Sequence, residues 1–234
     1  MIIALANQKG GVGKSTIAVH LAVWLKESGA RVALVDSDAQ SSSTLWIKEA
    51  EPEIPVFRLG TADDVLDQIP KIQANFDHLV IDAPGSLAEA TRAILFLTDL
   101  ALMPCGPSVM DLRAANDAIR VLRQVQGIRK GPPRALFVPN KVQSQYRLSR
   151  EFMDTAKALE IPASRALKLR QAYADAVGQG TVVWKMGRGA KDAADEILQL
   201  FKEVINNDTN STAPSEKEHV GSSDGIDPTS PGSN

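Results

Sequence analysis

The 234-residue sequence has one cysteine, Cys105, few aromatic residues and no long apolar run. One cysteine excludes a disulfide framework, a C-x-x-C redox motif and an iron–sulfur cluster held by several thiolates. With only 5% Phe, Trp and Tyr, the chain lacks the aromatic platforms on which single-stranded nucleic acids stack. A membrane-spanning helix needs about 18 apolar residues in a row, and a secretory leader needs a basic start. We therefore expect a cytoplasmic protein.

The net charge is close to zero, at −2, but the charges are unevenly distributed. Residues 129–191 hold 13 Lys and Arg against four Asp and Glu. Such a stretch either binds the phosphates of DNA or forms a solvated basic surface. The candidate DNA contacts, taken as a group, are Arg147, Arg150, Arg165, Lys168, Arg170, Lys185, Arg188 and Lys191.

Residues 206–234 are rich in Ser, Asn, Pro, Gly and Asp and contain almost no large apolar side chain. They cannot bury enough surface to offset the entropy lost on ordering. We therefore expect one folded domain at residues 1–205, followed by a disordered acidic tail at residues 206–234.

Within the expected domain, short aliphatic runs alternate with helical patterns. Strands are expected at residues 2–7, 31–36, 78–83, 100–105 and 135–140, and helices at 15–28, 61–74, 87–97, 108–126, 144–159 and 191–205. The strands are apolar on both faces, which is typical of a parallel sheet. The pattern predicts an α/β fold in which helices cover both faces of a twisted parallel sheet. In such a fold, ligands bind at the carboxyl ends of the strands.

The stretch "KGGVGKST", residues 9–16, lies between the first expected strand and the first expected helix. Its glycines let backbone N–H groups turn toward an anion, and the helix N-terminus adds partial positive charge. Lys14 would reach the β and γ phosphates of a nucleotide, Ser15 would bind Mg²⁺ and Thr16 would contact the α phosphate. The expected nucleotide contacts in this loop are Gly10, Gly11, Val12, Gly13, Lys14, Ser15 and Thr16.

Polar side chains follow three of the other expected strands. Asp36 and Asp38 in "VDSDAQ" would point to the same side, where they could hold the waters of Mg²⁺ and orient a hydrolytic water, or simply cap a turn. Asp82 in "HLVIDAPG" follows three apolar residues, as expected of an acid that binds the metal through water. The amide of Asn140 could either read the edge of adenine or form an Asn turn. The expected metal-side residues are Ser15, Asp36, Asp38 and Asp82.

Together, "KGGVGKST", "DSDAQ" and "VIDAPG" resemble the deviant Walker A, Walker A-prime and Walker B motifs of the ParA/MinD ATPases, and the likeness extends over about residues 1–205. The family usually has proline at the position of Ala39. The resemblance implies a P-loop NTPase that hydrolyses ATP with Mg²⁺ and dimerises around two ATP molecules. It also implies that Lys9 crosses to the partner's nucleotide, that Lys14 acts in its own subunit, and that Asp38 positions the attacking water.

Within this family, the chain resembles the short ParA type, which is ParF-like or McdA-like and lacks an N-terminal helix-turn-helix. The expected helix at residues 191–205 has an apolar stripe that we expect to pack in the core, with no stable membrane association. The stripe consists of Ala194, Ile197, Leu198, Phe201, Val204 and Ile205.

For a short ParA, the resemblance implies a bacterial, nucleoid-associated homodimer that binds DNA without sequence preference. A ParB-like or McdB-like adaptor would stimulate hydrolysis, and the cargo would be a plasmid, a chromosome region, a carboxysome or a protein cluster. Two alternatives remain open. One is a MinD-like membrane-associated positioning ATPase, and the other is a nucleotide-gated binding scaffold that hydrolyses little ATP.

Overall fold

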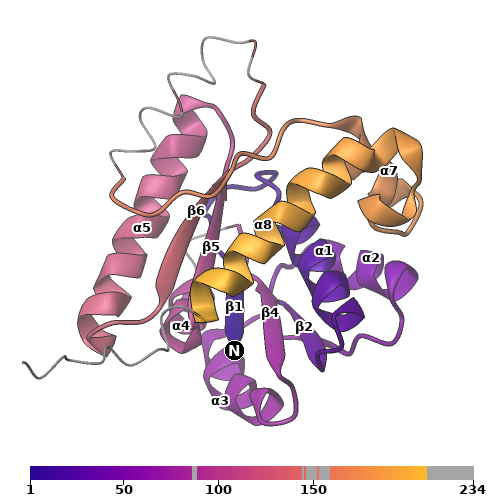
Figure 1. The fold of residues 1–234 in the computed structure, drawn as a ribbon. Coiled ribbons are helices and arrows are strands. Elements are labelled where there is room, and N and C mark those ends of the chain that lie inside the picture. The colour runs from indigo at the N-terminus through magenta and orange to yellow at the C-terminus, as the bar shows by residue number, and fades with distance from the viewer. Residues whose placement is uncertain (86–88, 144, 146–151, 153–158, 210–234) are drawn as a thin grey trace, which may run out of the picture.

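The computed structural model describes residues 1–85, 89–143, 145, 152 and 159–209. Six strands form one sheet in the order β3-β2-β4-β1-β5-β6 (Figure 1). All neighbouring strands are parallel, which confirms the predicted fold class. The strands are β1 (Ile2–Leu5), β2 (Val32–Asp36), β3 (Val56–Arg58), β4 (His78–Asp82), β5 (Leu100–Cys105) and β6 (Arg134–Pro139).

Helices connect the strands and continue after β6. They are α1 (Lys14–Glu27), α2 (Ser42–Ala50), α3 (Ala62–Gln73), α4 (Glu89–Leu97), α5 (Val109–Arg129), α7 (Gln171–Gly178) and α8 (Lys191–Thr209), with 3₁₀ turns at Val183–Lys185 and Arg188–Ala190. The predicted start of α3 is confirmed, because the Thr61 hydroxyl accepts a hydrogen bond of 3.1 Å from the backbone N–H of Asp64. The helix expected at residues 144–159 falls almost entirely outside the described residues.

Alternate strand residues pack against opposite helical layers, as a sheet buried on both faces requires. Ile3 and Leu5 of β1 belong to a core cluster shared with α1 and α8, which lie on the same side of the sheet in Figure 1. Ala4 belongs to a second cluster with residues of α3 and α4. On α8, Ile197 and Phe201 are fully buried, so the expectation that its apolar stripe packs in the core is confirmed.

Three described elements were not predicted from the sequence, and a fourth is longer than predicted. Neither the edge strand β3 nor the helices α2 and α7 were predicted. β3 has only three residues, and none of them is fully buried, so it is too short to show the aliphatic run of the other strands. Helix α8 ends at Thr209, whereas the folded domain was predicted to end at residue 205.

Candidate nucleotide-binding site

In the loop between β1 and α1, the backbone adopts conformations that favour glycine. Gly11 and Gly13 adopt positive φ angles of 75° and 101°. Gly13 is also the N-cap of α1, and its carbonyl accepts a hydrogen bond of 3.0 Å from Ile17. A Cβ atom at Gly13 would lie 2.2 Å from Nδ2 of Asn140. Both the conformation and the space therefore require glycine at this position.

Lys14 begins α1 and is buried, at 6% exposure. Its Nζ donates a hydrogen bond of 3.1 Å to the carbonyl of Lys9. The side chain of Lys14 thus links the end of the loop to its beginning. Burial lowers the pKa of Lys14, while the nearby carboxylates of Asp82 and Asp38 act in the opposite direction. The lysine predicted to reach the phosphates therefore lies near two of the three acids predicted to act with the metal.

The two buried acids of the site occupy matching positions on adjacent strands, since Asp36 of β2 is in register with Asp82 of β4. Asp36 is well bonded: one oxygen accepts from the backbone N–H of Asp38 at 3.1 Å, and the other accepts from the N–H and the hydroxyl of Thr44 at 2.9 and 2.6 Å. In this structure Asp36 ties the turn after β2 to the start of α2. Its predicted role beside the metal stays a prediction.

Asp82 is 1% exposed, and neither of its oxygens has a hydrogen-bond partner of normal geometry among the described residues. Burial raises the pKa of Asp82 to about 6. The hydroxyls of Ser15 and Ser43 approach closely enough to oppose this effect in part, Asp36 adds to it, and Lys14 opposes it. A buried carboxylate without partners costs free energy unless a counter-charge is supplied.

The environment of Asp82 fits a magnesium ion. Mg²⁺ is typically held by one or two protein oxygens, with phosphates and waters completing its octahedron, and the Ser15 hydroxyl lies beside Asp82. Among the described residues, no group of three His, Cys, Asp or Glu side chains is arranged to hold a metal by itself. Ser15 and Asp82 would therefore hold the ion together with the nucleotide, as the sequence predicts.

Asp38 lies two residues beyond the end of β2 in a tight turn, so the alternation of an extended strand does not place it. Its carboxylate accepts a hydrogen bond of 2.9 Å from the N–H of Gln40, and its carbonyl accepts one of 3.0 Å from Ser41. Asp38 is only partly buried. It is near enough to Lys14 to influence its pKa, which is compatible with an acid that faces the phosphates.

A cavity of about 320 Å³ adjoins the loop. Its lining includes Gly13, Thr16, Asn140, Lys141 and Tyr173. Asn140 directly follows β6, but its amide already bonds to protein: Nδ2 donates to the carbonyl of Val12 at 2.7 Å, and Oδ1 accepts from the N–H of Lys141 at 2.9 Å. The cavity lies where a nucleoside would extend from the loop, while the adenine contact of Asn140 stays a prediction.

The side chain of Lys9 pairs with a residue outside the phosphate loop. Its Nζ forms an ion pair with Asp111 in the first turn of α5, and its side chain is 40% exposed. Val109 and Met110 lie beside Asp111 in sequence and are 56% and 61% exposed. The second lysine of the motif therefore lies at a partly apolar surface next to the site.

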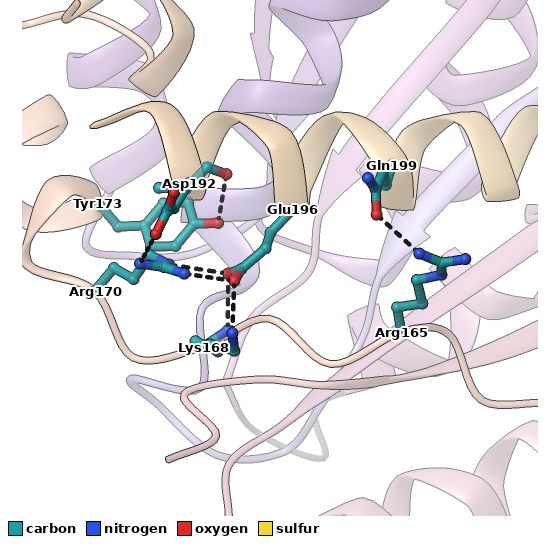
Figure 2. A network of polar contacts seen from close by, with 8 residues as sticks. Arg165, Lys168, Arg170, Tyr173, Asp192, Glu196 and Gln199 are labelled. Atoms are coloured by element: carbon teal, nitrogen blue, oxygen red, sulfur yellow. Dashed lines mark hydrogen bonds and ion pairs between the residues drawn. The ribbon is translucent and has the colours of Figure 1, made fainter. Parts of the chain in front are cut away.

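In the folded structure, acidic side chains of α8 lie against the basic stretch of residues 129–191 and pair with some of its cations (Figure 2). Arg170 pairs with Glu196 at 2.7 Å and with Asp192 at 3.1 Å. Figure 2 shows Lys168 directed to the same Glu196, at 3.6 Å. Residues 159–205 hold seven Lys and Arg against six Asp and Glu. The positive charge of the stretch is largely offset there.

The other candidate DNA contacts that the structure describes divide into two groups. Lys185 pairs with Glu27 and Glu51 at 2.9 and 3.3 Å, and Arg165 pairs with Glu203 at 3.2 Å. By contrast, Arg188 and Lys191 are exposed and make no ion pair with any described residue. The other two candidates, Arg147 and Arg150, lie outside the described residues.

Sequence reasoning missed three residues that shape the site. Thr44 holds Asp36, Asp111 holds Lys9, and Lys141 donates a hydrogen bond of 2.6 Å to the carbonyl of Gly11. Thr44 lies eight residues after Asp36, Asp111 lies in α5 far along the chain from Lys9, and neither belongs to a motif. Lys141 directly follows Asn140, and this adjacency was the only available signal.

A glycine loop that opens a helix at the carboxyl edge of a parallel sheet, beside a buried lysine and a carboxylate without partners, defines a P-loop nucleotide-binding protein. A family model described as the CobQ/CobB/MinD/ParA nucleotide binding domain matches residues 3–183, and the chain belongs to this family.

Individual relatives are similar over most of their length. The chain is 34% identical over 211 residues to the "Maintenance of carboxysome distribution protein A" of Halothiobacillus neapolitanus, which covers 87% of this chain and 95% of the relative. An ATP complex of McdA from Cyanothece has a TM-score of 0.75 at 18% identity and covers 88% and 96% of the two chains. Cobyrinic acid a,c-diamide synthase of Mycobacterium smegmatis, with bound ADP and magnesium, has a TM-score of 0.60 at 25% identity and covers 80% and 96%.

Family membership and the site together identify an ATPase of the ParA and McdA type that uses ATP and Mg²⁺. Bound Mg²⁺ would neutralise phosphate charge during hydrolysis. The chain's own residues would hold the phosphates with loop N–H groups and Lys14, orient a water with Asp38, and provide metal-side oxygens from Ser15 and Asp82. None of the helices in the described part of the chain is both long and apolar enough to cross a membrane.

Proposed function

We propose that this ATPase is a positioning protein: ATP closes a homodimer, the dimer binds DNA without sequence preference, and a ParB-like or McdB-like adaptor on a cargo stimulates hydrolysis and release. The 34% identical relative takes its name from carboxysome distribution. Among the cargo classes, this favours a carboxysome or a similar large assembly.

The observation that carries the proposal is the direction of Lys9. Its ammonium group pairs with Asp111 outside its own phosphate loop, although the loop already contains Lys14. A lysine held at the surface beside the exposed Val109 and Met110 is placed to enter a second copy of the site. Closing that interface would bury the apolar side chains of Val109 and Met110. Lys9 would then leave Asp111 and pair with the phosphates bound to the partner subunit.

For DNA, the ion pairs with α8 favour some of the proposed contacts over others. A cation that is paired with an acid of α8 must break that ion pair before it binds a phosphate. Arg188 and Lys191 form no ion pair with a described residue, so their binding to a phosphate breaks none. A dimer would present two copies of this pair, so weak binding by one subunit becomes stronger when ATP joins two. We infer that Arg188 and Lys191 dominate the electrostatic contact within the described part of the chain.

The test is ATP-dependent DNA binding across a salt series. R188Q/K191Q should weaken binding and reduce the slope of log K against log[salt] by up to about 3.6, at about 0.9 for each of four lost phosphate contacts in the dimer. The matched control, R165Q/K168Q, removes the same number of charges from residues paired with α8 and should change the slope less. Equal slopes for the two variants would refute the assignment, and ATP-dependent binding to liposomes instead of DNA would refute the DNA proposal.

A further inference from the structure

The residue that directly follows β6 and Asn140 lies against the phosphate loop. Nζ of Lys141 donates a hydrogen bond of 2.6 Å to the carbonyl of Gly11. Next to it, Nδ2 of Asn140 donates one of 2.7 Å to the carbonyl of Val12. Two consecutive residues of the chain thus hold two consecutive carbonyls of the loop.

The backbone of Lys141 is itself unusual. Its φ angle is +56°, a region that residues other than glycine rarely adopt. Such a conformation persists where the surrounding contacts determine it, and it is common at functional sites. Here it accompanies a side chain that returns from the end of β6 to the loop after β1, 130 residues away in sequence.

Holding these carbonyls also orients the loop's N–H groups. In a trans peptide unit, the C=O of one residue and the N–H of the next lie in one plane and point in opposite directions. Fixing the Gly11 carbonyl toward Lys141 therefore turns the N–H of Val12 away from Lys141. Fixing the Val12 carbonyl likewise turns the N–H of Gly13 away from Asn140. Neither N–H donates to any described residue.

We propose that Lys141 is a positioning residue for the ATPase reaction, which acts through the Gly11 carbonyl to present loop N–H groups to the nucleotide's phosphates before the nucleotide arrives. The effect is preorganisation: without the ammonium group, bound phosphates would have to order the loop at the expense of affinity. The inference rests on nucleotide binding by one chain and needs neither the dimer nor DNA.

The test is equilibrium binding of ADP and ATP to the full chain. Lys141→Met keeps the aliphatic stem and removes the donor, so affinity for both nucleotides should fall about tenfold, as expected for one charge-assisted hydrogen bond. The kcat at saturating ATP should change less than about twofold, because occupied phosphates then order the loop. Lys141→Arg should restore most of the affinity.

Lys130 provides a matched control, because it is also an exposed lysine at positive φ, 53°, at the far end of α5. Lys130→Met should bind ADP as the wild type does. Unchanged ADP binding by Lys141→Met, or failure of Lys141→Arg to restore it, would overturn the proposal. A changed preference for ATP over GTP would also overturn it, since a loop-positioning residue should affect both nucleotides equally. ADP binding by the monomer is measured without DNA, so this result is separate from a failure of the positioning function.

Discussion

Replacing Asp82 with asparagine should stabilise the nucleotide-free protein while abolishing its Mg²⁺-dependent binding of ATP. The carboxylate is 1% exposed and has no hydrogen-bond partner of normal geometry in the described part of the chain. Its burial raises its pKa to about 6, compared with 3.8 for an ordinary aspartate. The asparagine side chain has the same shape without the charge, and the hydroxyls of Ser15 and Ser43 are near enough to interact with it.

The magnitude follows from the difference between these pKa values. Between pH 3.8 and about 6, the folded state binds more protons at Asp82 than the unfolded chain does. The free energy of unfolding therefore falls as the pH rises through this window, and the loss is complete above it. A pKa difference of about 2 corresponds to about 3 kcal/mol. For a chain of this size, that is a rise in Tm of about 6 to 12 °C for Asp82→Asn at pH 7.5, and most of the gain should disappear at pH 4.

Thermal unfolding in EDTA without nucleotide tests this prediction, with Asp36→Asn as the matched control. Asp36 is equally buried and in register with Asp82, but its carboxylate accepts three hydrogen bonds. Its replacement should cost about 1 to 3 kcal/mol, because a buried donor loses its acceptor. If Asp82→Asn destabilised the protein as Asp36→Asn does, Asp82 would already be paired or solvated, and the argument for a cation at this position would fail.

Three further predictions concern the phosphate loop, the buried His20 of α1 and Asp38. Gly13→Ala should abolish ADP binding in a calorimetric titration, because its Cβ would lie 2.2 Å from Asn140, whereas Gly29→Ala, with φ +91° and no atom within 4 Å of its Cβ, should bind normally. Burial lowers the pKa of His20 to about 4, so at this residue the unfolded chain binds more protons than the folded one from about pH 6.5 down to 4. His20 alone should therefore remove about 3 kcal/mol over that range, which opposes the gain expected from Asp82. In urea unfolding, His20→Gln should gain about 3 kcal/mol relative to the wild type between about pH 6.5 and 4, and an identical pH dependence of the two proteins would exclude this contribution of His20. Asp38→Ala should retain ATP binding and lose steady-state phosphate release; equal release would favour a scaffold that hydrolyses no ATP at this site.

The phosphate loop, α1 and the five longer strands could be predicted because their signals are local. Glycines before a helix and aliphatic runs buried on both faces indicate the local conformation without information from the rest of the chain. Asp82 could be predicted for the same reason, since it ends such a run. β3 could not, because it is a three-residue edge strand.

The basic stretch shows where sequence reasoning fails. Adding charges along residues 129–191 treats them as neighbours, but Arg170 lies against Asp192 and Glu196 of α8, which begins at the end of that stretch. The roles of Asp36 and Lys9 were also incomplete without the structure. Thr44 and Asp111, which hold them, become neighbours only when the chain folds.

The most direct test of the account is the ATP-dependent mass of the Lys9→Ala variant, measured by light scattering beside an ATP titration. The account predicts that ATP and Mg²⁺ double the mass of the wild type. The variant should bind ATP through Lys14 and the loop but stay monomeric, because its partner-directed lysine is missing. A variant that dimerises with ATP as the wild type does would contradict the central claim that Lys9 completes the site of a second chain.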